Sequence, residues 1–140
     1  CIDSTNDDIR YQRNKIRHRV IPELESINPN VVDAIARLGG SVSEDLAVIS
    51  DLTVQAFKRL VTIDKGEMRL SRRALRKEPL AIQRRLWQRL VSSIDSDITL
   101  TTAHQEQLLD IVNTGEAKTF TIKSIKVIAQ CDTIKVYCKH

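Results

Sequence analysis

The fold is decided by residues 31 to 61, which read VVDAIARLGGSVSEDLAVISDLTVQAFKRLV. Apolar residues recur there every three or four positions, which is the spacing of one face of an α-helix. They are Val31, Ile35, Leu38, Val42, Leu46, Ile49, Leu52, Ala56 and Leu60. The pattern predicts one long amphipathic helix. Gly39-Gly40 costs roughly 1 kcal/mol per glycine against alanine, so we expect the helix either to break there or to pack closely against another backbone.

Another helix is expected before this one, over residues 7 to 20. Asn6 is a suitable N-cap, and Asp7 and Asp8 lie where carboxylates favour the positive end of the helix dipole. Pro22 is expected to kink or restart the helix. The tripeptide at residues 28 to 30, Asn-Pro-Asn, should end this segment and begin the long helix.

After the long helix, the sequence predicts three shorter ones. Ser71 caps a helix over residues 72 to 77, and Pro79 begins one that runs to about Ser93 and buries Leu80 and Trp87, the latter as a core anchor. Thr101 or Thr102 caps the third, which ends before Gly115. Between the long helix and Ser71, the segment Thr62 to Leu70 is either two short extended pieces joined by a turn or a loop.

The hydrophobic period changes to two after Gly115. Residues 119 to 122, 124 to 129 and 133 to 137 are rich in β-branched and aromatic side chains, with a turn near Asp132. We therefore expect a mainly α fold: a helical domain with a small C-terminal antiparallel β-sheet, a hairpin packed on the helices. Lys123, Lys126 and Lys135 should then point toward solvent or a ligand.

Charge is distributed unevenly along the chain. The net charge is only +4, but residues 58 to 89 hold eleven Lys or Arg against three acidic residues. Residues 118 to 140 form a second basic block. Such a field favours a polyanionic partner, and nucleic acid more than a membrane surface. The three cysteines and three histidines are scattered, without metal-ligand spacing, so we expect no metal site and reduced thiols.

The N-terminal segment carries the most specific motif. Residues 3 to 24, DSTNDDIRYQRNKIRHRVIPEL, resemble the D-x-S/T-N-x-D-x-x-Y-x-R-N-x-I-R-x-x-x-x-P-x-L segment of bacterial tRNA(Ile)-lysidine synthases. In that family the segment links an ATP-using catalytic domain to the first C-terminal domain. The resemblance implies that residues 1 to 22 are a linker helix and residues 23 to 140 a helical tRNA-binding domain, both from a longer cytoplasmic protein.

The reaction of that family defines the expected cofactors and partners. Lysidine synthases use ATP and Mg²⁺ to adenylate the wobble cytidine of tRNA(Ile), and free lysine then displaces AMP. The loop that binds ATP would lie before Cys1, so the resemblance implies an ATP-dependent ligase for the whole protein and no cofactor or activity for this chain alone. No membrane partner is expected, and homodimer formation is left open.

The candidate site residues fall into three groups. The resemblance gives Arg13 and Arg17 a supporting catalytic role, because a guanidinium beside the ATP phosphates offsets charge that develops during nucleotidyl transfer. By the same resemblance, Asp3, Asn6 and Asn14 hold the shape of the motif. The basic strip at 58 to 89 supplies the candidates for tRNA contact, which are Arg72, Arg73, Arg76, Lys77, Arg85 and Arg89.

Two other functions stay open at this stage. One is a non-catalytic helical interaction domain whose basic strip is merely solvated. The other is the accessory domain of a related ATP pyrophosphatase that thiolates tRNA, since the cysteines of such an enzyme could lie upstream.

Overall fold

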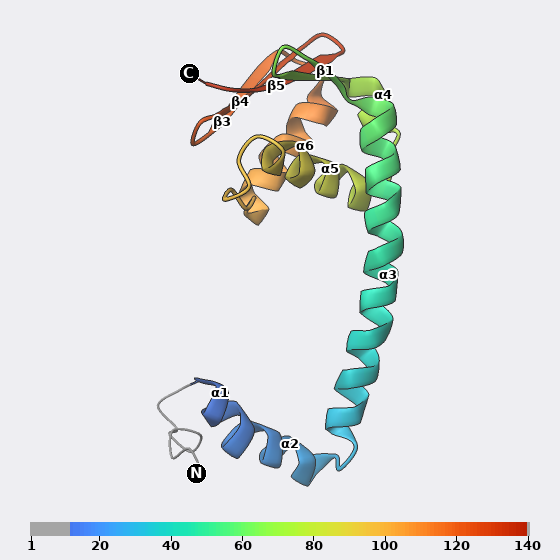
Figure 1. The fold of residues 1–140 in the computed structure, drawn as a ribbon, viewed down its shortest axis with the longest axis vertical. Helices are drawn as coiled ribbons and strands as arrows, with labels where there is room; N and C mark the ends of the chain where they lie inside the picture. Colours follow the sequence, from blue (N-terminus) through green and yellow to red (C-terminus); the bar gives the residue numbers. More distant parts are fainter. Residues whose placement is uncertain (1–11, 140) are drawn as a thin grey trace. The chain divides into compact units, whose positions relative to one another are not determined.

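The computed structural model describes residues 12 to 139 (Figure 1). Helices dominate, and a five-stranded antiparallel sheet includes the C-terminal strands, so the expected fold class is confirmed. The chain divides into two units between Leu46 and Ala47, within one helix. The boundary expected after residue 22 separates a linker from a tRNA-binding domain by function, and it stays a prediction.

The described part of the first unit contains only helices and one turn. Its elements are α1 (Gln12–Lys15), the π-helix η2 (Ile16–Val20), α2 (Ile21–Ile27) and the start of α3 (Val31–Leu60). Pro22 lies in the first turn of α2. Just before it, the backbone N–H of Ile21 bonds to the carbonyl of Ile16, five residues back. The chain therefore enters α2 through one wider turn. Asn6, the expected cap, lies outside the described residues.

Helix α3 is continuous from Val31 to Leu60. It follows the expected Asn28-Pro29-Asn30 turn, in which the N–H of Asn30 donates to Oδ1 of Asn28 at 3.0 Å. Both expectations for Gly39-Gly40 are wrong. The helix passes through the pair without a break, and a Cβ added to either glycine would meet no atom within 4 Å. Helical turns on both sides of the pair offset the low helix propensity of the two glycines, because extending an existing helix costs less than starting one.

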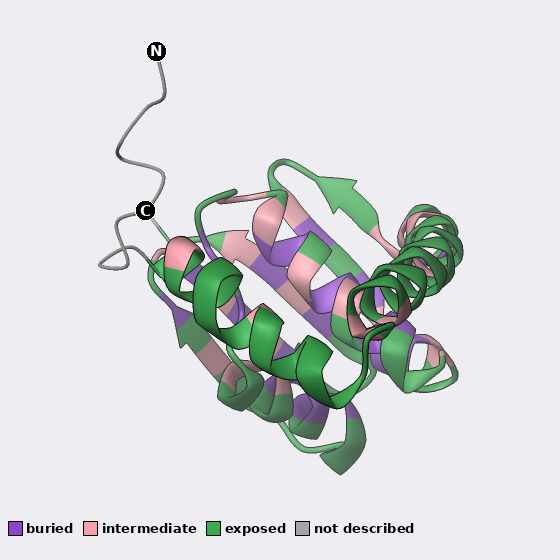
Figure 2. Ribbon diagram, turned by 90° about the horizontal axis from the view of Figure 1, so that it is seen from below, coloured by how far each residue is buried: buried purple, intermediate pink, exposed green. Residues whose placement is uncertain are grey.

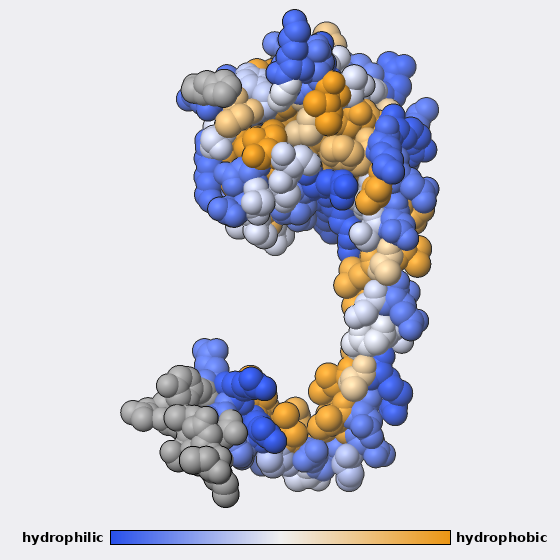
Figure 3. All heavy atoms as spheres, in the orientation of Figure 1, coloured by the Kyte–Doolittle hydropathy of each residue, from blue (hydrophilic) through white to orange (hydrophobic). Residues whose placement is uncertain are grey.

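The apolar residues of α3 in the first unit are largely exposed. Leu38 is 64% exposed and Ile35 is 58% exposed. Figure 3 shows apolar side chains on the surface of this helix. The amphipathic pattern predicted the helix correctly, but within the described part of this unit no core covers the apolar face.

The second unit contains the end of α3, three further helices and the sheet. Its helices are α4 (Arg72–Arg76), α5 (Leu80–Ser92) and α6 (Thr102–Thr114), and its strands are β1 (Thr62–Asp64), β2 (Glu67–Ser71), β3 (Lys118–Ile122), β4 (Ile125–Gln130) and β5 (Thr133–Cys138). The strand order is β1-β2-β5-β4-β3, and every pair is antiparallel. Helices α5 and α6 lie against one face of the sheet (Figure 1).

The sheet is larger than the expected hairpin because residues 62 to 71 join it. Of the two alternatives for this segment, the extended one is right. Lys65 and Gly66 form the turn with φ of 48° and 83°, a conformation that glycine adopts without strain. Strand β2 then pairs with β5, and Arg69 lies opposite Lys135. This long-range pairing has no local sequence signal.

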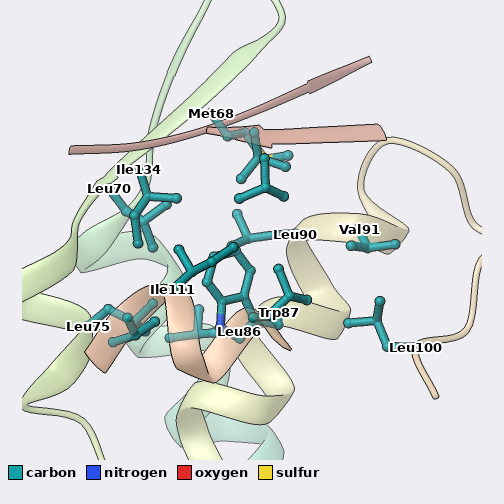
Figure 4. Close-up of a cluster of buried hydrophobic side chains, with 14 of the residues drawn as sticks. Met68, Leu70, Leu75, Leu86, Trp87, Leu90, Val91, Leu100, Ile111 and Ile134 are labelled. Carbon is teal, nitrogen blue, oxygen red and sulfur yellow. The ribbon is translucent and has the colours of Figure 1, made fainter. Parts of the chain in front are cut away.

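The hydrophobic core lies between the sheet and the helices. Figure 2 shows buried residues concentrated there. Trp87 is fully buried, as expected, and Figure 4 shows it among Leu86, Leu90 and Ile111. The expectation that Leu80 is buried is wrong, since this residue is 48% exposed. Ile82 takes its place because it lies four residues before Leu86 and shares its helix face.

Candidate nucleic-acid interface

The residues of the N-terminal motif are only partly described. Asp3 and Asn6 lie outside the described residues. Arg13 is on α1 and Arg17 is in η2, and both side chains are exposed. Asn14, between them, is half-buried. Exposure leaves both guanidinium groups accessible to an anion, but their catalytic role stays a prediction.

Arg72 has a structural position. It is only 3% exposed, and its Nη2 donates to the carbonyl of Glu116 at 2.7 Å. Its backbone N–H donates to the carbonyl of Asp132 at 2.6 Å. The residue thus ties the start of α4 to the segment after α6 and to the β4–β5 turn. A guanidinium inside the domain presents no surface to an RNA, so Arg72 does not belong to the candidate interface.

Arg76 is exposed along its side chain, but its guanidinium caps another helix. Nη2 donates to the carbonyls of Val112 and Asn113 at 2.6 and 2.7 Å, and Nε donates to Val112 at 3.2 Å. These carbonyls belong to the last turn of α6, where the helix itself supplies no donors and the dipole favours a cation. Its geometry therefore assigns Arg76 to the packing of α4 on α6.

Arg73 and Lys77 are turned outward and share a groove with Arg59. The groove has a volume of about 480 Å³ and lies between the end of α3 and α4. Arg59 forms an ion pair with Glu78 at 2.6 Å, so its charge is largely compensated. Arg73 and Lys77 add two positive charges to the same groove. Of the six basic residues predicted to contact tRNA, these two have the most suitable positions for a phosphate.

Arg85 and Arg89 lie together at a different groove. They are one helical turn apart on α5, and the groove of about 290 Å³ is completed by hydroxyl groups of Ser50, Thr53 and Ser92. Arg89 is exposed, as expected, and its guanidinium lies 5.2 Å from the centre of the Phe57 ring. Arg85, expected on an exposed face, is half-buried. The Thr53 hydroxyl donates to the carbonyl of Ile49 at 2.7 Å, so the two serine hydroxyls and the two cations are the groups that suit an anionic ligand.

The β4–β5 turn holds the start of α4 in place through Asp132. Its carboxylate accepts hydrogen bonds from the hydroxyl of Ser71 at 2.7 Å and from the backbone N–H of Arg73 at 2.8 Å. The Ser71 hydroxyl bond, the Arg73 N–H bond and the nearby arginine charges hold the pKa of Asp132 below its ordinary value. Ser71 also accepts from the N–H of Ala74 and so caps α4, as predicted.

The face of the sheet that points away from the core carries further cations. Arg69 on β2 lies opposite Lys135 on β5. Glu67 accepts a hydrogen bond from Arg69 and lies 3.7 Å from Lys135. The bond from Arg69, together with the charges of Arg69 and Lys135, lowers the pKa of Glu67, and Glu67 in turn raises the pKa of Arg69. Arg59 and Arg69 belong to the basic strip, but only the fold could show which grooves they line.

The described residues contain neither a group of three His, Cys, Asp or Glu side chains that could hold a metal ion nor a helix long and apolar enough to cross a membrane.

Comparison with known proteins gives a consistent family. No protein-family model matches the chain. It is 32% identical over 97 residues to a tRNA(Ile)-lysidine synthase of Geobacter sulfurreducens, a match that covers 69% of this chain and 21% of that protein. It is also 32% identical over 108 residues to a protein of the same name from a Nostoc species, a match that covers 68% of this chain and 32% of that protein. A third protein of this name, from Leifsonia xyli, is 34% identical over 104 residues, and the match covers 73% of this chain and 31% of that protein.

The chain spans about a fifth to a third of the length of these curated relatives. All three carry the same name, and each match extends over most of the chain, far beyond the 22 residues of the N-terminal motif. The resemblance expected from the sequence is therefore confirmed: the chain is related to one segment of the tRNA(Ile)-lysidine synthase family.

Proposed function

We propose that the chain is the tRNA-binding portion of a tRNA(Ile)-lysidine synthase. The observation that carries this proposal is the groove in which Arg73 and Lys77 present two outward charges, in a chain whose relatives are named for a tRNA substrate. In the whole protein, the reaction would ligate lysine to the wobble cytidine of tRNA(Ile) with ATP and Mg²⁺. The shared name of the relatives favours this function over a tRNA-thiolating enzyme or a non-catalytic interaction domain.

The groove supports backbone binding because its cations are accessible and held on short, rigid elements. Helix α4 is anchored by Ser71, Asp132 and Arg76, so Arg73 and Lys77 project from a fixed platform. Arg85 and Arg89 extend the cationic surface of the second unit along α5. Such contacts neutralise phosphates without reading bases, so this surface would position the tRNA and discrimination would come from elsewhere.

A salt titration tests the proposal. Affinity of the chain for an unmodified tRNA(Ile) transcript is measured by filter binding across a series of salt concentrations. Removal of one cation that neutralises a phosphate should reduce the slope of log affinity against log salt by about 0.7 to 0.9. We expect Arg73→Ala/Lys77→Ala to reduce the slope by the amount that corresponds to one or two lost phosphate contacts.

The matched control is Arg37→Ala/Arg84→Ala, which removes two exposed charges outside the grooves described above. If this control and the groove variant weaken binding equally, the effect is one of net charge and the groove is not the interface. If the wild-type chain shows no salt-dependent binding to tRNA, the proposed function itself is wrong.

A further inference from the structure

The outer face of the sheet, defined here by Arg69, Lys126, Ile128, Lys135 and Tyr137, has no role in the function proposed above. Buried and half-buried residues alternate along the central part of β4 and β5, which places Val127, Ala129, Ile134 and Val136 on the core side. The outer-face residues are their sequence neighbours. Among the described residues of this unit, the helices pack against the core side, and the outer face is open (Figure 1).

The strand register sets these side chains side by side. Lys135 of β5 lies between Arg69 of β2 and Ile128 of β4. Two residues further along β5, Tyr137 lies directly opposite Lys126. Residues two apart on a strand are separated by about 7 Å, and neighbouring strands by about 5 Å. An aromatic ring and an aliphatic side chain thus lie among three cations on one surface.

The same face is hollowed. A depression of about 780 Å³ has a mixed lining. It includes the cations Arg69 and Lys135, the carboxylate of Asp132, the apolar residues Leu60, Leu70 and Ile128, and the polar residues Thr62, Ser71, Gln130, Cys131 and Thr133. This volume is within the range of small-molecule sites. Its lining combines apolar side chains, Ile128 among them, with hydrogen-bond donors and acceptors. The combination suits a nucleobase more than a phosphate alone.

Two carboxylates, Glu67 and Asp132, offset part of the charge of the three cations at this face, so it is poorly suited to hold a duplex by its backbone alone. Glu67 contacts both Arg69 and Lys135 and compensates part of their charge. Lys126 has no ion pair with the described residues. Duplex RNA hides the faces of its bases, whereas unpaired nucleotides can stack on aromatic rings and place their phosphates beside scattered cations. The outer face therefore matches unpaired RNA.

We propose that the outer face of the sheet binds unpaired nucleotides, with one base stacked on Tyr137, a neighbouring base in the depression over Ile128, and phosphates beside Lys126 and Lys135. The inference rests on the proposed function, because it takes RNA as the partner. It adds a second surface, chemically distinct from the backbone-binding groove at Arg73 and Lys77.

Fluorescence anisotropy with the full chain tests the inference. The probe is an eight-nucleotide single-stranded RNA of mixed sequence labelled with fluorescein, and the competitor is the same strand annealed to its complement. We expect Tyr137→Ala to weaken binding about tenfold, within the range measured for the loss of one base stack. Tyr137→Phe keeps the ring and should bind within about twofold of wild type. Lys126→Ala should weaken binding, whereas the control Lys58→Ala, on the exposed surface of α3, should not.

Two results would overturn the inference: binding unchanged by Tyr137→Ala, or a duplex that competes as well as the single strand. If Tyr137→Ala does not fold, as judged by circular dichroism, photocrosslinking of the wild-type chain to a 4-thiouridine oligonucleotide decides instead. Adducts on β4 and β5 support the inference, and adducts elsewhere refute it. If tRNA binds with its full salt slope but the oligonucleotide does not bind, only this inference fails. If neither binds, the proposed function fails as well.

Discussion

Replacing Arg76 should destabilise the second unit without changing the salt dependence of its affinity for tRNA. The Arg76 guanidinium donates three hydrogen bonds to the carbonyls of Val112 and Asn113 in the last turn of α6. A hydrogen bond to a charged group contributes about 1.5 to 3 kcal/mol net in buried sites. Because the Arg76 side chain is exposed and solvent competes for its donors, we expect Arg76→Ala to cost about 1 to 2 kcal/mol of the free energy of unfolding.

Thermal unfolding followed by circular dichroism measures this cost. For a unit of this size, each kcal/mol lowers the midpoint by about 4 to 8 °C, so Arg76→Ala should melt about 4 to 16 °C below wild type. Arg76→Lys keeps a charge near the helix end but cannot bridge two carbonyls, so it should recover only about 0.3 to 1 kcal/mol. Arg84→Ala, an exposed substitution on α5, should change stability by no more than about 0.5 kcal/mol.

The same variant separates the two roles considered for Arg76. Well below the midpoint, Arg76→Ala should bind tRNA with the wild-type salt slope, because its guanidinium is engaged by α6 and not by phosphate. A wild-type melting midpoint together with a slope reduced by nearly one unit would refute this reasoning and return Arg76 to the tRNA surface.

Three further outcomes can be checked. Gly39→Ala and Gly40→Ala should each raise the free energy of unfolding by about 0.5 to 1 kcal/mol, because both glycines lie inside a continuous helix with open space around them. The denaturant midpoint measures this change, and a midpoint that falls instead would show that the helix needs to bend there. The pKa of Asp132 is lowered in the folded state, so its stabilising effect is complete above the ordinary value of 3.8 and is lost as the pH falls through the folded pKa. In a plot of the free energy of unfolding against pH, Asp132→Asn should therefore reduce the loss of stability on the acid side. An unchanged plot would exclude Asp132 as the origin of that loss. In the full-length enzyme, Arg13→Ala or Arg17→Ala should lower single-turnover lysidine formation more than tRNA affinity, and normal turnover in both variants would remove them from catalysis.

Local signals in the sequence were enough for most of the elements. Ser71 and Thr101 cap α4 and α6 because a hydroxyl followed by a helical pattern needs only its nearest neighbours to form the bond. Gly115 ends α6 with φ of 76° for an equally local reason. Trp87 could be placed in the core because its position in the apolar arc of α5 depends only on the helical period.

The candidate interface was less predictable, because a run of basic residues does not show which way each one points. Arg72 and Arg73 are adjacent in the sequence, yet Arg72 is inside the domain and Arg73 is on the surface. The carbonyls that hold Arg72 and Arg76 come from residues about 40 positions later in the chain. No periodicity within the basic strip contains that information.

By itself, the sequence determined the family, the helical class of the fold and the excess of positive charge, since motif, period and composition are properties of neighbouring residues. Only the tertiary structure decided which cations are exposed and that β2 pairs with β5 to make a five-stranded sheet with an open outer face. The physical reason is that burial and strand pairing depend on contacts between distant segments. Arg69 and Lys135 are separated by more than sixty residues in the chain and become neighbours only when the sheet forms.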